Sequence, residues 1–333
     1  MFKKQNKIYI FRALNFIKDI MFELHKTFFK PILIVFFMIC LPSFGQQDPQ
    51  ITHNMFNKFM YNPAVAGAYP ELHATLLHRN QWVGIDGAPS TSNLNAHAYV
   101  DQIRGGVGLN VINDKVGMLS AKTISMSYAY QLGLGPGHQL GMGLSFGFMQ
   151  YGYDGTWITP DGTSDSALPS TGSSKGVPDF GLGFYFTSED YYIGLSATHI
   201  IPMDVDFDGK AIYNQARHYY FLAGYDYNIT DEFSLRGNIF SKTDGVSLQT
   251  DLNINTFWKE NYWTGLSFRY EDALCFLLGF QVANNLTFAY AFDLVTSKLS
   301  TQANGSHEVL LRYSFELDVI GRGDTRYRSV RFL

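Results

Sequence analysis

The feature that most constrains the fold is an alternation of large apolar residues with small or polar ones, which recurs from Leu72 almost to the end of the chain. It is clearest between Leu286 and Leu294, where Leu, Phe, Tyr, Phe and Leu alternate with Thr, Ala, Ala and Asp. A strand sorts such residues onto two faces, whereas a helix would scatter them around its axis. From Leu72 onward the chain is therefore predicted to be all-β.

There are fourteen alternating segments. Every second connection between them belongs to the same end of the predicted sheet, and the long connections all belong to one end. The segments are 72–83, 91–100, 105–113, 122–132, 139–151, 179–187, 191–198, 217–227, 233–242, 247–258, 262–270, 273–282, 286–294 and 306–315. The longest connections, 152–178, 199–216 and 295–305, all have the same parity, whereas those of the other parity are short. An even number of strands with short turns on one side is typical of a bacterial outer-membrane barrel. We predict a transmembrane antiparallel β-barrel over residues 72–315, with its apolar faces against lipid.

The N-terminus has the pattern of a secretory signal peptide. Lys26 and Lys30 form a basic region, residues 31–41 form an apolar region too short to span a bilayer, and Ser43 and Gly45 are small residues before a cleavage site. Residues 1–45 are predicted to be removed. Met21 is an alternative start that would give a leader of ordinary length.

The mature chain is acidic. Residues 1–45 hold seven of the 25 basic and two of the 29 acidic residues, so their removal leaves a net charge of −9. This charge argues against nucleic acid as a partner. Cys275 becomes the only cysteine, which excludes an internal disulfide. We expect residues 46–71 to be a non-strand segment that plugs the barrel or lies beneath it, and residues 316–333 to be a periplasmic tail.

Several charged residues fall on the inward face of the predicted strands. We expect them to pair with one another, although a selectivity ring or a partner-binding lumen is the alternative. They are Arg236, Asp251, Arg269, Asp293, Glu308 and Arg312.

Two motifs bear on catalysis and cofactors. Residues 143–147 match the G-x-S-x-G nucleophile elbow, but they lie inside an alternating strand rather than at a strand-to-helix turn, so we expect no enzyme. Asp204, Asp206 and Asp208 match the opening of a calcium loop, but its twelfth position is Gln215, which offers no bidentate carboxylate. A weak Ca²⁺ site and an ordinary acidic loop both remain open, and no other cofactor is expected.

The connection 152–178 is the candidate partner-binding surface. It carries Trp157 together with Asp161 and Asp165, which combine an aromatic anchor with negative charge. Exposed Trp is often central to binding hot spots. Ordinary loop decoration is the alternative interpretation.

Short blocks spread along the mature chain resemble the PorP/SprF family of Bacteroidota. These blocks are residues 47–51 (QDPQI), 55–57 (MFN), 61–67 (YNPAVAG), 79–82 (RNQW), 87–89 (GAP), 106–109 (GVGL), 113–114 (ND), 217–220 (RHYY) and 306–309 (SHEV). The resemblance implies an outer-membrane protein of the type IX secretion system. Such proteins support the export and surface attachment of large surface proteins, including gliding adhesins, each serving a cognate client through the client's C-terminal domain.

The expected partners are thus that client, other type IX secretion components and outer-membrane lipid. A passive porin or small-solute transporter is the alternative function. The resemblance brings no catalytic residues, and the identity of the client cannot be read from the sequence.

Overall fold

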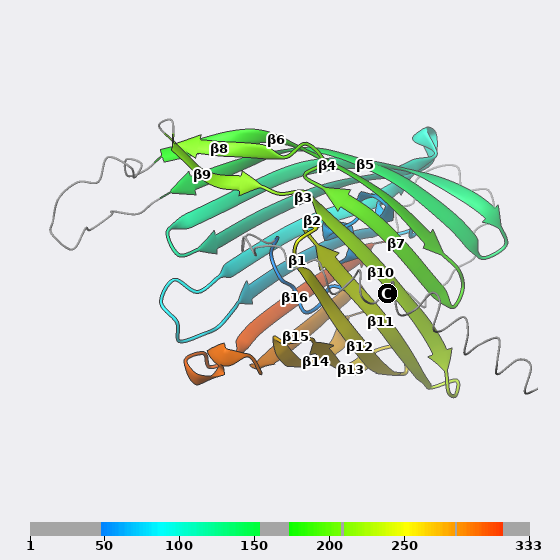
Figure 1. Cartoon of the computed structure of the whole chain (residues 1–333). Helices are drawn as coiled ribbons and strands as arrows, with labels where there is room; N and C mark the ends of the chain where they lie inside the picture. The colour runs from blue at the N-terminus through cyan, green and yellow to red at the C-terminus, as the bar shows by residue number, and fades with distance from the viewer. Residues whose placement is uncertain (1–47, 154–172, 208–209, 284, 316–333) are drawn as a thin grey trace, which may run out of the picture. The chain divides into compact units, whose positions relative to one another are not determined.

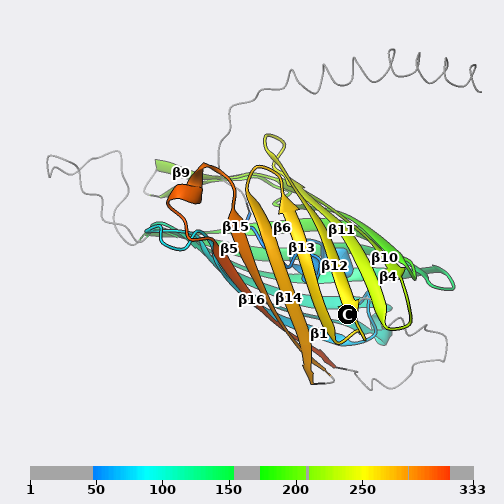
Figure 2. The same cartoon turned by 90° about the horizontal axis from the view of Figure 1, so that it is seen from below.

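The computed structural model describes residues 48–153, 173–207, 210–283 and 285–315. Within them, fourteen antiparallel strands close into a barrel, in which β1 pairs with both β2 and β16 (Figures 1 and 2). Closure leaves no free sheet edge around the wall, as a membrane requires. The barrel strands are β1 (Leu72–Asn80), β2 (Ser90–Val100), β3 (Gly105–Val116), β4 (Leu119–Gly135), β5 (His138–Tyr153), β6 (Ser173–Thr187), β7 (Tyr191–Thr198), β10 (His218–Asn228), β11 (Phe233–Thr243), β12 (Leu248–Trp258), β13 (Tyr262–Arg269), β14 (Ala273–Ala283), β15 (Leu286–Val295) and β16 (Ser306–Phe315).

All fourteen predicted strands are present, and the differences concern their ends. The predicted connection 114–121 is almost entirely strand, because β3 and β4 continue to Val116 and Leu119 and meet in a tight turn. The predicted loop 199–216 contains a separate hairpin of β8 (Met203–Phe207) and β9 (Lys210–Gln215). Val205 of β8 is buried in an apolar cluster with Met149 and Val177 of the barrel wall.

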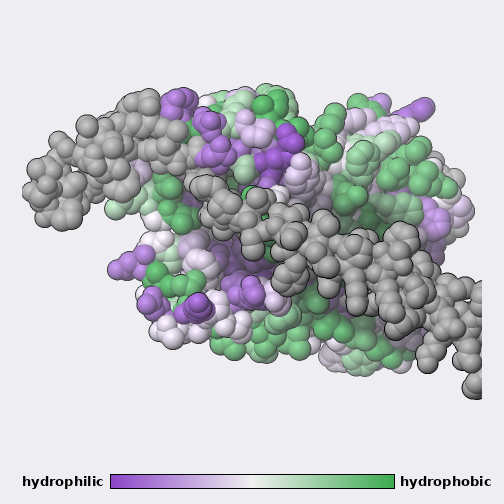
Figure 3. All heavy atoms as spheres, in the orientation of Figure 1, coloured by the Kyte–Doolittle hydropathy of each residue, from purple (hydrophilic) through white to green (hydrophobic). Residues whose placement is uncertain are grey.

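The alternation places apolar side chains outside and small or polar ones inside. Met126 of β4 is 68% exposed and Leu144 of β5 is 66% exposed, whereas Ala289 and Ala291 of β15 are fully buried. Hydrophobic residues accordingly spread over the outside of the wall in Figure 3. This is the arrangement of a barrel whose outer face meets lipid.

The two ends of the barrel differ in their connections. At the end that we call the short-turn end, no connection exceeds four residues. At the opposite end, which we call the long-loop end, lie the connections 81–89, 154–172, 199–217 and 296–305. The prediction that the long connections share one end is confirmed.

A segment without strands occupies the interior, and we call residues 48–71 the plug. It contains two short 3₁₀ helices, η2 (Lys58–Met60) and η3 (Pro63–Val65), and every residue from 50 to 67 is buried. No helix among the described residues is long and apolar enough to span a membrane.

Wall glycines give the plug its space. A Cβ at Gly106 of β3 would collide with the backbone of Ala66, and a Cβ at Gly143 of β5 would collide with the backbone of Ala64. Gly143 belongs to the G-x-S-x-G match, which lies inside β5. The glycines on the inward face thus let the plug backbone approach the wall closely.

Candidate functional site

Five charged residues form a buried network inside the long-loop end of the lumen. Arg269 Nε lies 3.0 Å from Asp251 Oδ1, and its Nη1 lies 3.1 Å from Asp293 Oδ2. Arg79 approaches the same Asp293 at 2.7 Å and Glu308 at 3.2 Å. None of these five residues is more than 1% exposed. The expected pairing of the inward charges with one another is confirmed for Asp251, Arg269 and Asp293, whereas Glu308 pairs with Arg79, which the prediction did not include.

The start of the plug completes this network. The backbone N–H groups of Thr52 and His53 donate to the Glu308 carboxylate, each at 2.8 Å. The Thr52 hydroxyl lies 2.8 Å from Asp293 Oδ2 and accepts from Arg79 at 3.0 Å. The network joins five barrel strands to the plug. Removing one charge would therefore leave a buried partner without its counter-ion. The ion pairs therefore fasten the plug at this end.

Aromatic packing and amide hydrogen bonds hold the next part of the plug. Phe56 stacks on Trp263 of β13 with ring centroids 4.2 Å apart. Asn57 donates to Asn93 of β2 at 2.9 Å, and the Asn62 amide donates to the carbonyl of Phe184 at 3.0 Å. These contacts reach strands around the whole circumference, so the plug crosses the lumen rather than lining one wall.

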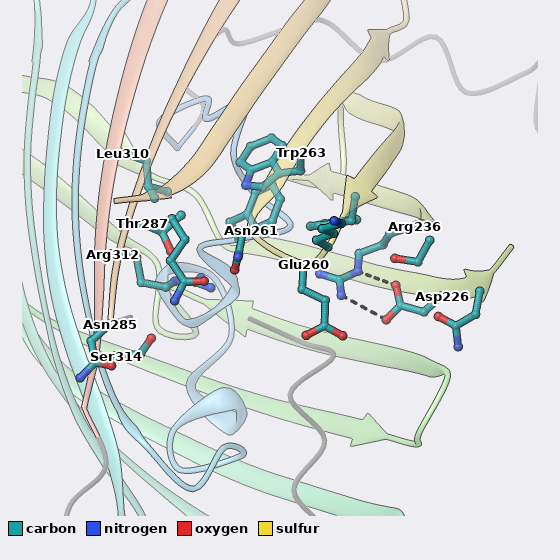
Figure 4. A pocket seen from close by; sticks show the side chains of 16 residues that line it. Asp226, Arg236, Glu260, Asn261, Trp263, Asn285, Thr287, Leu310, Arg312 and Ser314 are labelled. Atoms are coloured by element: carbon teal, nitrogen blue, oxygen red, sulfur yellow. Dashed lines mark hydrogen bonds and ion pairs between the residues drawn. The ribbon is translucent and has the colours of Figure 1, made fainter. Parts of the chain in front are cut away.

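The short-turn end holds a polar cavity of about 270 Å³ beside the plug. Figure 4 shows Arg236 paired with Asp226 on one side of the cavity and Arg312 on the other. The Arg236 Nε–Asp226 Oδ1 distance is 2.6 Å, whereas Arg312 forms no ion pair with any described residue. Burial, together with the nearby Arg236 and Arg312, holds the pKa of Lys58 in the plug well below its ordinary value. The cavity lining thus holds three basic side chains, those of Arg236, Lys259 and Arg312, and two acidic ones, those of Asp226 and Glu260.

The predicted calcium residues lie partly in the hairpin. Asp204 and Asp206 belong to β8, and Asp208 lies outside the described residues. Asp204 accepts from Asn214 at 2.5 Å, and Asp206 pairs with Lys175 at 2.8 Å. Their carboxylates therefore meet side chains of neighbouring strands.

The predicted partner-binding residues Trp157, Asp161 and Asp165 also lie outside the described residues. Sequence reasoning missed the role of Arg79, which is central to the buried network. The alternation of β1 places Arg79 on the inward face, and this could have predicted that Arg79 joins the inward charges. The hydrogen bonds from Thr52 and His53 could not be predicted in the same way. The plug has no alternating pattern, so its sequence does not show which of its residues face the wall.

The solved structures that resemble the chain are of low sequence identity. The KdgM porin is 12% identical over 73% of this chain and 99% of that chain, with a TM-score of 0.38. Outer membrane protein Omp33 of Acinetobacter baumannii is 8% identical over 74% of this chain and 98% of its own, with a TM-score of 0.43. A FadL homologue of Pseudomonas aeruginosa is 11% identical over 82% and 95%, with a TM-score of 0.43. No curated protein matches the chain.

The family comparison covers most of the chain. Residues 43–313 match the model of the type IX secretion system membrane protein PorP/SprF. This range begins before the plug and ends in the last barrel strand, so the match includes the plug, the wall and the buried ion network that joins them. The chain is an outer-membrane β-barrel that belongs to the PorP/SprF family of type IX secretion system membrane proteins.

Proposed function

We propose that this barrel supports the export and surface attachment of a cognate large surface protein, such as a gliding adhesin, by docking the client's C-terminal domain. The observation that carries the proposal is the plug, whose residues 50–67 are buried and tied to the wall by the ion network. A lumen filled in this way is poorly suited to passing solute. A client protein would therefore bind at the surfaces of the barrel ends and not inside the lumen.

The long-loop end is the docking surface that we favour. The connection 154–172 between β5 and β6, with Trp157, Asp161 and Asp165, belongs to this end, and so does the β8–β9 hairpin. Loops that are held by a rigid scaffold often carry binding residues. The wall and the fastened plug form such a scaffold.

A passive porin is the second candidate, and the barrel architecture itself favours it. Porin-like barrels hold a water-filled lumen, whereas this barrel holds the plug. Electrical conductance separates the two functions, because a porin conducts alone and a plugged docking barrel does not.

The docking proposal is tested in the native host by shortening the connection within 156–172, which leaves β5 and β6 intact. We expect the barrel to fold and insert while the cognate surface protein disappears from the cell surface and accumulates in the medium or inside the cell. The matched control, Glu232→Ala in a short turn of the opposite end, should preserve surface display. Normal display with the shortened connection would refute this docking site.

A further inference from the structure

Three residues from distant parts of the chain meet at the long-loop end of the lumen. Asp48 begins the described part of the plug, His199 follows β7, and His218 begins β10. Asp48 Oδ1 lies 3.0 Å from His199 Nε2 and 4.0 Å from His218 Nδ1. One candidate ligand atom from each residue lies within 4.8 Å of the other two. Both histidines are buried, so this is an enclosed cluster rather than a chance surface grouping.

The two imidazoles are oriented by acceptors behind them. His199 Nδ1 lies 2.7 Å from Asp179 Oδ1, and His218 Nδ1 lies 3.0 Å from the carbonyl oxygen of Ala216. A carbonyl only accepts hydrogen bonds, so the Nδ1 of His218 carries the proton. The Nδ1 of His199 also lies 2.9 Å from the amide nitrogen of Gln215, so Asp179 and Gln215 together hold this ring. The Nε2 of His199 faces Asp48 Oδ1, and the Nε2 of His218 accepts from the backbone N–H of Asp48 at 3.3 Å, so both rings converge on this residue. Metal-binding histidines are commonly held by such a second hydrogen bond.

The Asp48 carboxylate is held in the same way. Its Oδ2 accepts from the hydroxyl of Tyr220 and lies 3.4 Å from Thr198 Oγ1. Lys242 donates to the backbone carbonyl of Asp48 at 2.9 Å. These contacts fix the residue while Oδ1 remains directed at His199, as a ligand that binds through one oxygen would be.

We propose that Asp48, His199 and His218 bind one divalent transition-metal ion of the zinc class, which fastens the start of the plug to the barrel wall. Two imidazoles and one carboxylate are an established zinc donor set, which leaves a further position for water. The carboxylates of Asp48 and Asp179 offset the two positive charges of the ion. The competing interpretation is an ion pair only, with His199 protonated between these two carboxylates.

Metal titration of the folded mature protein tests the proposal. The protein is purified in detergent, stripped with EDTA and titrated with Zn²⁺ by calorimetry, and Co²⁺ serves as a spectroscopic probe. We expect about one Zn²⁺ per chain, visible d–d absorption from Co²⁺, and a higher melting temperature with Zn²⁺, because a ligand that binds the folded state stabilises it.

The variants separate ligands from their supports. Asp48→Asn and His218→Gln each remove a ligand and should lower zinc affinity at least 100-fold. Asp179→Asn removes only the acceptor behind His199 and should lower it about 10- to 100-fold. His138→Gln, at an exposed position of the short-turn end, should leave it unchanged.

Two results overturn the proposal. If the wild type binds no Zn²⁺, the cluster is an ion pair only. If Asp48→Asn and His218→Gln bind Zn²⁺ as tightly as the wild type, any zinc lies elsewhere. Heat-dependent migration on gels identifies variants that fail to fold. If the variants do not fold, the Co²⁺ spectrum of the wild type tests the proposal, because nitrogen ligands change the position and intensity of the d–d bands.

Discussion

The two ends of the lumen hold the plug in different ways. At the long-loop end, Arg79 contacts two acidic residues and Arg269 contacts three, and the plug backbone donates into the same network. At the short-turn end, Arg236 pairs with Asp226 and Arg312 forms no ion pair with a described residue, and both line a cavity. The long-loop end thus holds two arginines among three carboxylates in a dry interior, whereas the short-turn end holds a cavity whose lining has one more basic than acidic side chain.

This difference indicates where the lumen could open. Breaking a buried ion pair is costly because the remaining charge cannot be hydrated. At the cavity, water can replace a lost partner at lower cost. The long-loop end should therefore be the more stable seal, and the short-turn end the place where the plug loosens first.

The largest effect is expected from Arg269→Met. The change leaves Asp251 and Asp293 without one of their cations in a dry interior, which should cost about 3–5 kcal/mol of unfolding free energy. Urea unfolding in detergent or lipid measures it. Arg236→Met at the cavity is the matched control and should cost about 1–3 kcal/mol. Equal losses of unfolding free energy in the two variants would contradict the claim that the long-loop end is the more stable seal.

A second test contrasts the lipid face with the cavity along one strand. Tyr290 of β15 points outward near the middle of the wall, and Thr287 of the same strand lines the cavity. Tyr290→Arg should destabilise the inserted barrel by about 2–4 kcal/mol, whereas Thr287→Glu, which faces Arg312 across the strand pair, should be tolerated. The amount of folded barrel in the outer membrane reports both. A tolerated Tyr290→Arg would contradict the assignment of this face to lipid.

Thr52→Val probes the junction between plug and network. It removes a hydroxyl that bonds Asp293 and Arg79 while preserving shape, so we expect a loss of about 1–3 kcal/mol. Unfolding curves measure it. Thr264→Val on β13, whose hydroxyl donates only to the Leu277 carbonyl, should lose less. The opposite order would show that the plug junction is not under strong constraint.

The smallest effect is expected at the rim of the short-turn end. Lys259 and Glu232 pair at 3.4 Å, but both side chains are more than half exposed. Lys259→Ala should change stability by no more than about 1 kcal/mol. High salt should leave little difference between variant and wild type in unfolding experiments. A large loss would mean that this rim contributes to the seal.

The barrel wall could be predicted from the sequence because each strand has lipid on one side and the lumen on the other. Apolar and polar side chains must therefore alternate along it. Strand ends were harder: Asp114 and Lys115 continue the ladder of β3, but outside the apolar band the alternation has no reason to persist. The inward parity of Arg269 and Asp293 predicted their pairing. The contact of Asp48 with His199 and His218 could not be predicted. The two histidines lie more than 150 positions from Asp48 along the chain, and no sequence pattern links them to it.

The most direct test of the sealed lumen is single-channel conductance in planar bilayers. The wild type is compared with a barrel that lacks residues 48–67, and with an Arg79→Met/Arg269→Met variant in case the deletion does not fold. We predict no stepwise conductance from the wild type and open-pore steps when the plug is removed or its ion network is broken. Wild-type steps as large as those of the plug-less barrel would contradict the account and favour a passive porin.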